Sequence, residues 1–266
     1  MLCVPRSGFY VWKRRPITVS AQSNLQLGED VQRLFDAEKG RAGAPRITRR
    51  LHDENKRVGH NRVAKIMREK GLRAKAAKKY KATTNSKHNL PVAPNLLEQN
   101  FEAEQPNQKY VSDITYIWTA EGWLYLAVVL DLYSRNVVGW AMAERMTSTL
   151  VCDAFLMAMF RRKKPRGVIA HSDRGSQYCS REYQRILKKY GAICSMSKKG
   201  DCYDNAAMES WNHSLKVEAI HGENFVTRAE AKAAVFEYIE VYYNRNRLHS
   251  KLGYLSPEAF ELRKVA

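Results

Sequence analysis

The sequence has few cysteines, no long apolar run and far fewer acidic than basic residues. The five cysteines are scattered and form no C-x-x-C pair, which argues against a disulfide framework or a structural zinc site. The longest apolar run, 124–132, contains Asp131 and is too short to span a bilayer, and no secretory signal is visible at the start. These absences predict a cytoplasmic protein that does not enter a membrane.

Basic residues outnumber acidic ones by 45 to 27, which gives a net charge of +18. This balance predicts an anionic partner, and without a membrane segment nucleic acid is favoured over an anionic membrane surface. The charge is concentrated in residues 41–90, where 16 basic residues and three acids supply 13 of the 18 net charges. A hydrophobic fraction of 44% nevertheless predicts a folded protein.

The basic region contains three predicted helices, over 29–38, 45–55 and 61–70. Apolar side chains recur at helical spacing in the last two, and Gly59 separates them, as is typical of a helix-turn-helix that binds DNA. A pair of solvated basic helices without groove contact is the alternative. The side chains expected to contact DNA are Arg46, Arg49, Arg50, Arg62, Lys65, Arg68 and Arg73.

Composition divides the chain into four segments. Residues 1–28 are interpreted as an N-terminal remnant or linker, and residues 29–82 as the helix-turn-helix-like DNA-binding region. Residues 83–108 form a polar connector with several Pro and Asn residues, which predicts a linker. Residues 109–266 are expected to form the larger domain, with a helical C-terminal extension.

The larger domain has the pattern of an α/β fold. The segments KYVSDITYIW, GWLYLAVVLDLYS and NVVGWAMAE predict three antiparallel strands, and a turn near Glu121 joins the first two. Helices are predicted over 147–162, 180–190, 204–219 and 228–244, with short strands at GVIAHSD and AICSMS between the first three. This order of elements is that of a ribonuclease-H-like fold.

Three carboxylates lie where an uncompensated charge is unfavourable. Asp113 lies inside the first predicted strand, Asp173 ends the strand GVIAHSD, and Glu209 lies on a predicted helix. Buried carboxylates repel one another unless a cation neutralises them, and oxygen ligands suit Mg²⁺. Two such ions would stabilise both the attacking and the leaving oxygen of a phosphoryl displacement.

Each acid also has a structural interpretation. Asp113 could cap a neighbouring strand, Asp173 could organise an Asx-turn, and Glu209 could be an exposed helix residue. Asp131 is the alternative to Asp113 as the first acid, although Arg135 four residues later offers it an ion-pair partner. His171 is expected to be a core histidine that hydrogen-bonds to the backbone.

Two further groups lie in the C-terminal part of the chain. The first is an aromatic stripe that is expected to belong to the core rather than to stack on bases: Phe236, Tyr238, Tyr242 and Tyr243. The second is the loop NRNRLHSK, whose candidate phosphate ligands are Arg245, Arg247 and Lys251.

The sequence around the acids resembles the Asp-Asp-Glu transposases and retroviral integrases, whose second and third acids are typically 35 residues apart. Residues 174–208 supply that interval, HSDRGSQY resembles the second-acid motif, and SKKGDCYDNAAMESWNHSLK resembles the third. The segments SGFYVW, GAPRITRRL, RVAKIMREKGLRA, DITYIW, LDLYSRNVVGW and YNRNRLHSKLGYLSPEAF further resemble the second-reading-frame product of bacterial insertion sequences with two overlapping frames.

The resemblance implies a ribonuclease-H-like, integrase-type core in which Asp113, Asp173 and Glu209 hold two Mg²⁺ ions, with Mn²⁺ as a substitute. Water and then a DNA 3′-hydroxyl would attack phosphodiesters at the element's ends and in the target. Lys216, two helical turns after Glu209, would contact DNA near the scissile phosphate. The alternatives are a nuclease that cleaves without joining strands, and an inactive DNA-binding copy.

The resemblance also implies partners. These are the DNA of the element's ends and of the target, an upstream-frame product or a frameshift fusion with it, and further copies of the chain that assemble on DNA. Related chains carry further residues ahead of the SGFYVW segment, which here follows Met1 closely. The sequence therefore leaves a truncated copy open.

Overall fold

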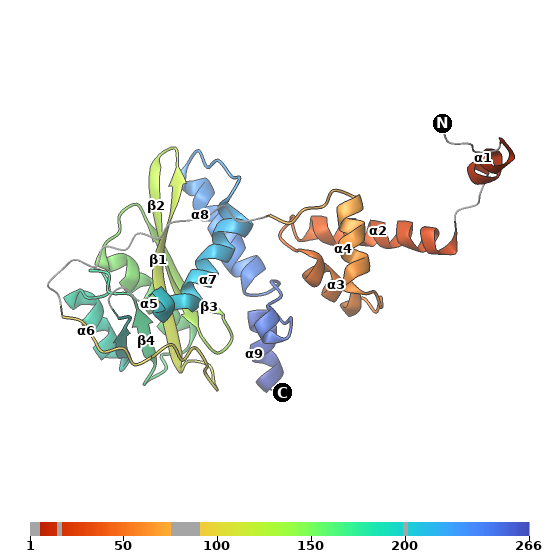
Figure 1. Cartoon of the computed structure of the whole chain (residues 1–266). Helices are drawn as coiled ribbons and strands as arrows, with labels where there is room; N and C mark the ends of the chain where they lie inside the picture. Colours follow the sequence, from red (N-terminus) through yellow and green to blue (C-terminus); the bar gives the residue numbers. More distant parts are fainter. Residues whose placement is uncertain (1–5, 15–17, 76–90, 199–201, 266) are drawn as a thin grey trace. The chain divides into compact units, whose positions relative to one another are not determined.

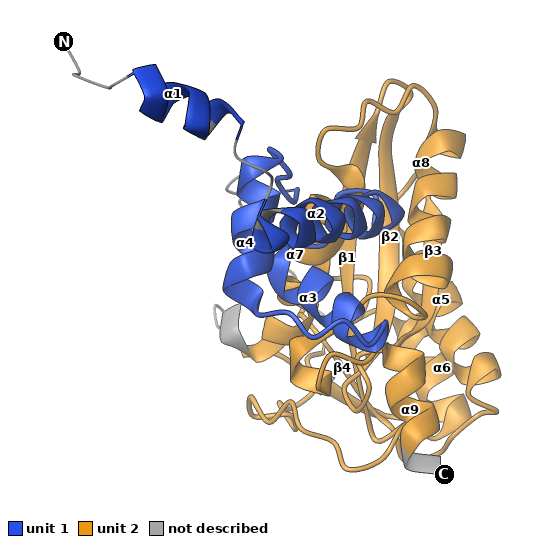
Figure 2. Ribbon diagram, turned by 90° about the vertical axis from the view of Figure 1, so that its right-hand side faces the viewer, with its two compact units in different colours: residues 1–75 blue, residues 76–266 orange. Residues whose placement is uncertain are grey.

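A computed structural model of the protein describes residues 6–14, 18–75, 91–198 and 202–265 (Figure 1). The chain divides into two units, Met1–Lys75 and Ala76–Ala266, which are coloured separately in Figure 2. No helix within the described ranges is long and apolar enough to cross a membrane.

The first unit is helical. Its elements are α1 (Arg6–Lys13), α2 (Val19–Ala37), α3 (Ala44–Asp53) and α4 (His60–Glu69). The helices predicted over 45–55 and 61–70 are confirmed as α3 and α4. The helix predicted to begin at residue 29 begins at Val19 instead, because Gly28 lies buried inside α2 against the side chain of Lys70 and does not end the helix. The segment interpreted as a remnant therefore contains helical structure.

The last three helices of this unit share one small core. Its buried side chains come from all three: Leu27, Val31 and Leu34 of α2, Ile47 and Leu51 of α3, and Val63, Ile66 and Met67 of α4. The i, i+3, i+4 spacing of these residues leaves the remaining faces of α3 and α4 to charged side chains. A packed helical pair with a basic exterior is the arrangement that the sequence predicts.

The second unit is built on a five-stranded mixed sheet. Its strands are β1 (Lys109–Thr119), β2 (Gly122–Asp131), β3 (Val137–Ala143), β4 (Ile169–Ser172) and β5 (Ile193–Met196). Their order across the sheet is β3-β2-β1-β4-β5, in which β1, β2 and β3 are antiparallel and β4 pairs in parallel with both β1 and β5. The predicted strands and the mixed α/β class are thus confirmed.

Helices cover both faces of the sheet (Figure 1). They are α5 (Ser148–Arg161), α6 (Arg181–Tyr190), α7 (Ala206–Leu215) and α8 (Arg228–Phe236), and the last helix, α9 (Pro257–Val265), lies beside the sheet near the C-terminus. Short 3₁₀ turns are η1 (Cys202–Asn205) and η4 (Ser250–Leu252), and α7 and α8 continue into π-helical segments, η2 (Lys216–Ile220) and η3 (Glu237–Tyr243).

Alternation along the strands sends side chains into two separate cores. Val111, Leu126 and Val128 pack with α7 and α8 on one face. Tyr110 and Val129 pack with α5 and α6 on the other. The sheet is therefore fully covered over its centre, and a polar side chain there requires a specific partner.

Helix α5 approaches β3 closely at Gly139. A Cβ atom at this position would overlap the backbone oxygen of Ala154 on α5. Glycine is required here because no larger side chain fits between the helix and the strand.

Part of the predicted linker 83–108 packs against the sheet domain. Residues 83–90 lie outside the described residues, but Leu97 is buried in the core of the second unit. The Asn95 side chain donates a hydrogen bond of 3.0 Å to the carboxylate of Asp204, and the backbone N–H of Leu96 donates one of 2.9 Å to the Ser195 hydroxyl. The segment 91–108 lacks helix and strand, yet it is fixed to the domain.

A buried ion pair fastens the C-terminal segment to the helix that follows α7. The Arg247 guanidinium donates to both carboxylate oxygens of Glu218, and its closest contacts are 2.8 Å. Tyr238 donates a further hydrogen bond of 3.0 Å to Glu218, and Arg247 also donates to Ser214. Arg247 is thus a buried structural residue, and the expectation that it contacts phosphate is wrong.

The other residues of the loop NRNRLHSK and those of the aromatic stripe differ in exposure. Arg245 and Lys251 are exposed, and Arg245 lies 3.5 Å from Glu258. Tyr238, Tyr242 and Tyr243 are buried in the core as expected, whereas Phe236 is 50% exposed.

We predict that Arg247→Ala lowers the free energy of unfolding by about 3–5 kcal/mol, because it leaves the Glu218 carboxylate buried without its cation. The matched control is Arg245→Ala, which removes an exposed ion pair and should cost less than about 1 kcal/mol. Urea denaturation of both variants gives the comparison. Equal stabilities for the two variants would show that the buried pair contributes nothing beyond a surface pair.

Candidate active site

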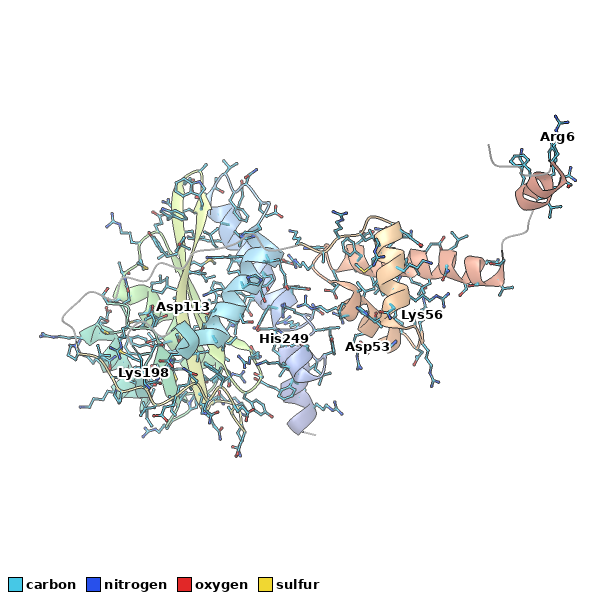
Figure 3. All side chains as sticks on the ribbon, in the orientation of Figure 1. Arg6, Asp53, Lys56, Asp113, Lys198 and His249 are labelled. Atoms are coloured by element: carbon cyan, nitrogen blue, oxygen red, sulfur yellow. The ribbon has the colours of Figure 1, made fainter. Side chains whose placement is uncertain are left out.

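Two of the predicted acids lie side by side because of the strand pairing. The parallel ladder between β1 and β4 ends at the pair Ser112↔Ser172, and Asp113 and Asp173 are the next residues of the two strands. Equivalent positions in neighbouring parallel strands lie about 5 Å apart. Figure 3 labels Asp113 on the sheet where α7 crosses it.

The Asp113 carboxylate is held by two hydrogen bonds. Its Oδ1 accepts from the backbone N–H of Ile114 at 2.8 Å, and its Oδ2 accepts from the side-chain amide of Asn212 at 2.7 Å. The pKa of Asp113 is raised to about 7, first by burial and then by the charges of Asp173 and Glu209, while the two hydrogen bonds oppose the rise. Repulsion between acids is therefore felt at this site, as the sequence predicts.

Asp173 forms a turn directly after β4. Its Oδ1 accepts a hydrogen bond of 2.9 Å from the backbone N–H of Gly175. The Asx-turn that was the structural alternative for this residue is therefore present. It does not compete with a role in the site, because the turn orients the carboxylate next to Asp113.

Glu209 lies in the first turn of α7 and is exposed. The opposite face of this helix is buried through Met208, Trp211 and Leu215, as expected from the sequence. Partial burial raises the pKa of the Glu209 carboxyl. Asn212, three residues later, faces Asp113, so the helix turns one polar stripe toward the strand carboxylates.

Lys216 is the first residue of η2 and is only 7% exposed. Its Nζ lies 5.0 Å from the ring centroid of Tyr116, which is cation–π geometry. Burial lowers the pKa of Lys216 to about 8, and the negative charge of Asp113 opposes this change. The ammonium group is thus close enough to interact with the carboxylate site.

Two site residues were not selected from the sequence. Asn212 orients Asp113, and its helical spacing from Glu209 was the available signal. Tyr178, at the end of the motif HSDRGSQY, is fully buried near both aspartates, whose charges, after burial itself, raise its pKa. Within the described ranges, the Tyr178 hydroxyl and Asn212 Oδ1 are buried without a hydrogen-bond partner.

Asp131 has a structural role. It is fully buried, and its carboxylate accepts from the backbone N–H groups of Asn107 at 2.8 Å and Tyr133 at 3.0 Å. Asp131 is the last residue of β2 and pairs with Tyr110 near the start of β1. It therefore lies at the end of the hairpin far from the turn between Thr119 and Gly122. Among the described residues no ion pair joins the Asp131 carboxylate to Arg135, and the backbone N–H of Arg135 donates instead to the backbone oxygen of Asp131 at 2.8 Å.

His171 is a core residue, as expected. Its Nδ1 lies 2.9 Å from the Ser195 hydroxyl, and its Nε2 lies 3.0 Å from the backbone oxygen of Asp204. Burial lowers the pKa of His171. A neutral imidazole in this network connects β4, β5 and η1 below the carboxylates.

The acids fit a divalent cation by their chemistry. Asp113 and Asp173 are neighbouring hard-oxygen donors whose mutual repulsion a cation would relieve. In the part of the chain that the structure describes, no three His, Cys, Asp or Glu side chains are close enough to form a ready-made metal cluster. The strand pair is thus in place, while Glu209 stands apart on the helix.

The predicted DNA-binding side chains of the first unit fall into two groups. The exposed ones are Arg49, Arg62, Lys65, Arg68 and Arg73. Arg46 and Arg50 are half-buried, and Arg50 pairs with the buried Glu38 at 2.9 Å. Arg50 therefore stabilises the helical unit, and within the exposed group Arg49 pairs with Asp53 at 3.1 Å and Lys65 lies 3.8 Å from Glu69.

The two units correspond to two known families of domains. Residues 103–202 and 209–264 match two models described as integrase core domains, and residues 22–80 match an HTH-like domain. Together with the fold and the paired aspartates, these matches define an enzyme with an integrase-type core and a DNA-binding unit. The integrase core also indicates that the enzyme uses a divalent metal ion.

Relatives make the assignment more specific. The chain is 52% identical over 268 residues to the transposase InsF for insertion sequence IS3A of Escherichia coli K12, which covers 100% of this chain and 93% of the relative. It is 46% identical over 257 residues to an uncharacterized 31 kDa protein of insertion element IS600 of Shigella sonnei, covering 97% and 94%. The chain belongs to this family of insertion-sequence transposases, which cleave DNA and transfer its strands.

Among solved structures, the chain is similar to the intasome of simian T-cell lymphotropic virus in complex with the PP2A regulatory subunit B56 gamma. The similarity has a TM-score of 0.49 and 16% sequence identity, and it covers 87% of this chain and 74% of the viral one.

We predict that Asp113→Asn stabilises the metal-free protein, and does so more at pH 8 than at pH 5. A carboxyl whose folded pKa is raised from 3.8 to about 7 destabilises the fold increasingly as the pH rises between these two values. The amide removes this cost, and Asn212 can rotate so that its unpaired Oδ1 accepts from the new amide. Thermal unfolding in chelator at both pH values tests this, and an equal or smaller gain at pH 8 would contradict it.

Proposed function

We propose that Asp113, Asp173 and Glu209 are the catalytic residues of this transposase and that they bind two Mg²⁺ ions, for which Mn²⁺ can substitute. The observation that carries this proposal is the juxtaposition of Asp113 and Asp173 at the end of the β1–β4 pairing. When bound, such ions polarise an attacking oxygen and neutralise the charge on the leaving one. Water and then a DNA 3′-hydroxyl are the attacking groups.

The surrounding side chains prepare this site. Asn212 donates to Asp113 and fixes the orientation of its carboxylate. Lys216 holds an ammonium group near Asp113, where it can contact a non-bridging oxygen of the scissile phosphate. Burial of Lys216 strengthens this interaction because less water screens its charge.

We expect Asp113→Asn, Asp173→Asn and Glu209→Gln each to abolish cleavage and strand transfer while DNA affinity stays within about threefold. Asp131→Asn is the matched control, because this buried acid on β2 binds backbone N–H groups and should retain activity if the variant folds. Cleavage of end-labelled duplex and joining of a pre-cut end measure the two steps in Mg²⁺, Mn²⁺ and Ca²⁺.

An active Asp113→Asn enzyme beside an inactive, folded Asp131→Asn enzyme would identify Asp131 as the first acid instead. Full activity in excess chelator would contradict the use of metal ions. Cleavage without joining of the pre-cut end would favour a nuclease over a transposase.

We also propose that the first unit binds duplex DNA through the exposed face of α4. Lys65 and Arg68 lie opposite the buried Val63 and Ile66, and the exposed Arg62 flanks the buried face. Phosphate contacts by such side chains give affinity that falls steeply with salt. The Arg62 side chain hydrogen-bonds to Asn24 and Ser23 of α2, which orients its guanidinium on this face.

We predict that Arg68→Ala reduces the magnitude of the salt slope of DNA binding by about one. Arg50→Ala should leave the slope unchanged and lower the melting temperature, because Arg50 pairs with Glu38. Fluorescence anisotropy of a duplex at several salt concentrations measures both. If only Arg50→Ala changed the salt slope, the DNA would be assigned to α3, which carries Arg50, and not to α4.

Finally, we propose that selective binding to the element's ends needs an upstream-frame product, supplied by fusion or assembly, and that several copies of the chain act together on DNA. One small helical unit reads few base pairs, so phosphate contacts dominate its affinity. Competition between terminal-repeat and random duplex tests this proposal. Equal selectivity for the chain alone and for its fusion would contradict it.

A further inference from the structure

The tip of the β1–β2 hairpin carries two exposed tryptophans. Trp118 is 60% exposed and Trp123 is 42% exposed, and the two residues are directly opposite each other in the strand register. Their ring centroids are 4.8 Å apart with an interplanar angle of 73°, so the rings meet edge to face. Large apolar side chains that are grouped on a surface mark a binding site more often than single ones do.

The same group of rings extends toward the carboxylates. Tyr116 lies two residues before Trp118 on the same side of β1, and its ring contacts that of Trp123 edge to face at 5.0 Å. The Nζ of Lys216 lies over the Tyr116 ring, also at 5.0 Å. A continuous series of contacts therefore runs from the lysine beside Asp113 to the exposed tryptophans.

The distance between this surface and the catalytic strand position is short. Trp118 is five residues after Asp113 on β1, which corresponds to about 16 Å along a strand. The strand β4 pairs with β1 only as far as Ser112, so no strand of the described segments covers that edge of β1 between Asp113 and the hairpin tip. Because this separation is odd, Asp113 and Trp118 point to opposite faces of β1, so DNA bound at the carboxylates would reach the rings by passing around this edge of the strand.

We propose that Trp118 and Trp123 stack against an unpaired base of the DNA strand next to the reacting phosphodiester. Aromatic side chains bind the faces of all four bases, so this surface would hold the strand without reading its sequence. Separating a base from its duplex has a cost, and stacking on the tryptophans offsets part of it. The proposal rests on DNA being the substrate and adds where its unpaired strand lies.

Charge at the hairpin restricts the path of this strand. The backbone N–H of Arg228 donates a hydrogen bond of 2.8 Å to Glu121, and its guanidinium lies 3.5 Å from the carboxylate of Glu144. The hairpin tip therefore presents acids as well as a cation. The phosphates are therefore expected on the side of Lys216. The Lys216 ammonium over the Tyr116 ring favours a nucleic-acid strand as the occupant, because a phosphate can pair with the ammonium while a base of the same strand stacks on the tryptophans.

The test uses the full chain with Asp113→Asn, so that no DNA is cut, and two DNA probes of random sequence. One is a blunt duplex, and the other is the same duplex with a five-nucleotide single-stranded tail. The parent should bind the tailed duplex more tightly. Trp118→Ala should lower affinity for the tailed duplex about tenfold and leave blunt-duplex affinity unchanged, whereas Trp118→Phe should retain most of the preference for the tail.

Phe160→Ala is the matched control, because Phe160 is a comparably exposed aromatic residue, at 58%, on α5 of the same unit. It should leave the affinity for both probes unchanged. Trp123→Ala provides a second variant of the proposed surface, and thermal unfolding verifies that each variant folds.

The proposal is overturned if both tryptophan variants bind the tailed duplex as the parent does, or if Phe160→Ala loses the same preference. A shift in the sedimentation of the DNA-free chain by Trp118→Ala, with the preference for the tail intact, would instead assign this surface to contact between copies of the chain. Because binding is measured without turnover, failure of the proposed metal mechanism would leave the result unaffected.

Discussion

The parallel pairing of β1 with β4 is the constraint on which the active site depends. The ladder stops at Ser112↔Ser172, and the next residue of each strand is an aspartate. Two carboxylates are thereby brought together from positions 60 residues apart in the chain. Burial and then mutual repulsion raise the pKa of Asp113, and this unfavourable charge is the physical basis of the proposed divalent-cation site.

The remaining groups reach this pair through one helix. Helix α7 packs on the sheet through Trp211 and its apolar neighbours, so its polar side turns Asn212 toward Asp113. The π-helical segment that follows carries Lys216 and then Glu218, whose buried pair with Arg247 anchors the C-terminal segment. Single π-helical turns within α-helices are frequent at functional sites.

Much of the fold and site could be predicted from the sequence. Strand alternation and helical spacing predicted the order of elements, and the local motifs selected Asp113, Asp173 and Glu209 as the candidate site, of which the structure brings the two aspartates together. Other features depend on tertiary contacts that no local pattern encodes. The start of α2 at Val19, ten residues before the predicted start, leaves Gly28 inside the helix against Ile66 of α4, and the loop residue Arg247 is buried beside Glu218 and does not face a phosphate. The contact of Asn212 with Asp113 likewise requires both elements to be in place.

The central claim is that the two strand aspartates form one cation site, and calorimetric titration of Mn²⁺ into the full chain bound to a DNA end tests it most directly. The account predicts saturable binding that is lost when either Asp113→Asn or Asp173→Asn is introduced, and that is preserved in a folded Asp131→Asn variant. Undiminished Mn²⁺ binding in both the Asp113→Asn and Asp173→Asn variants would contradict it.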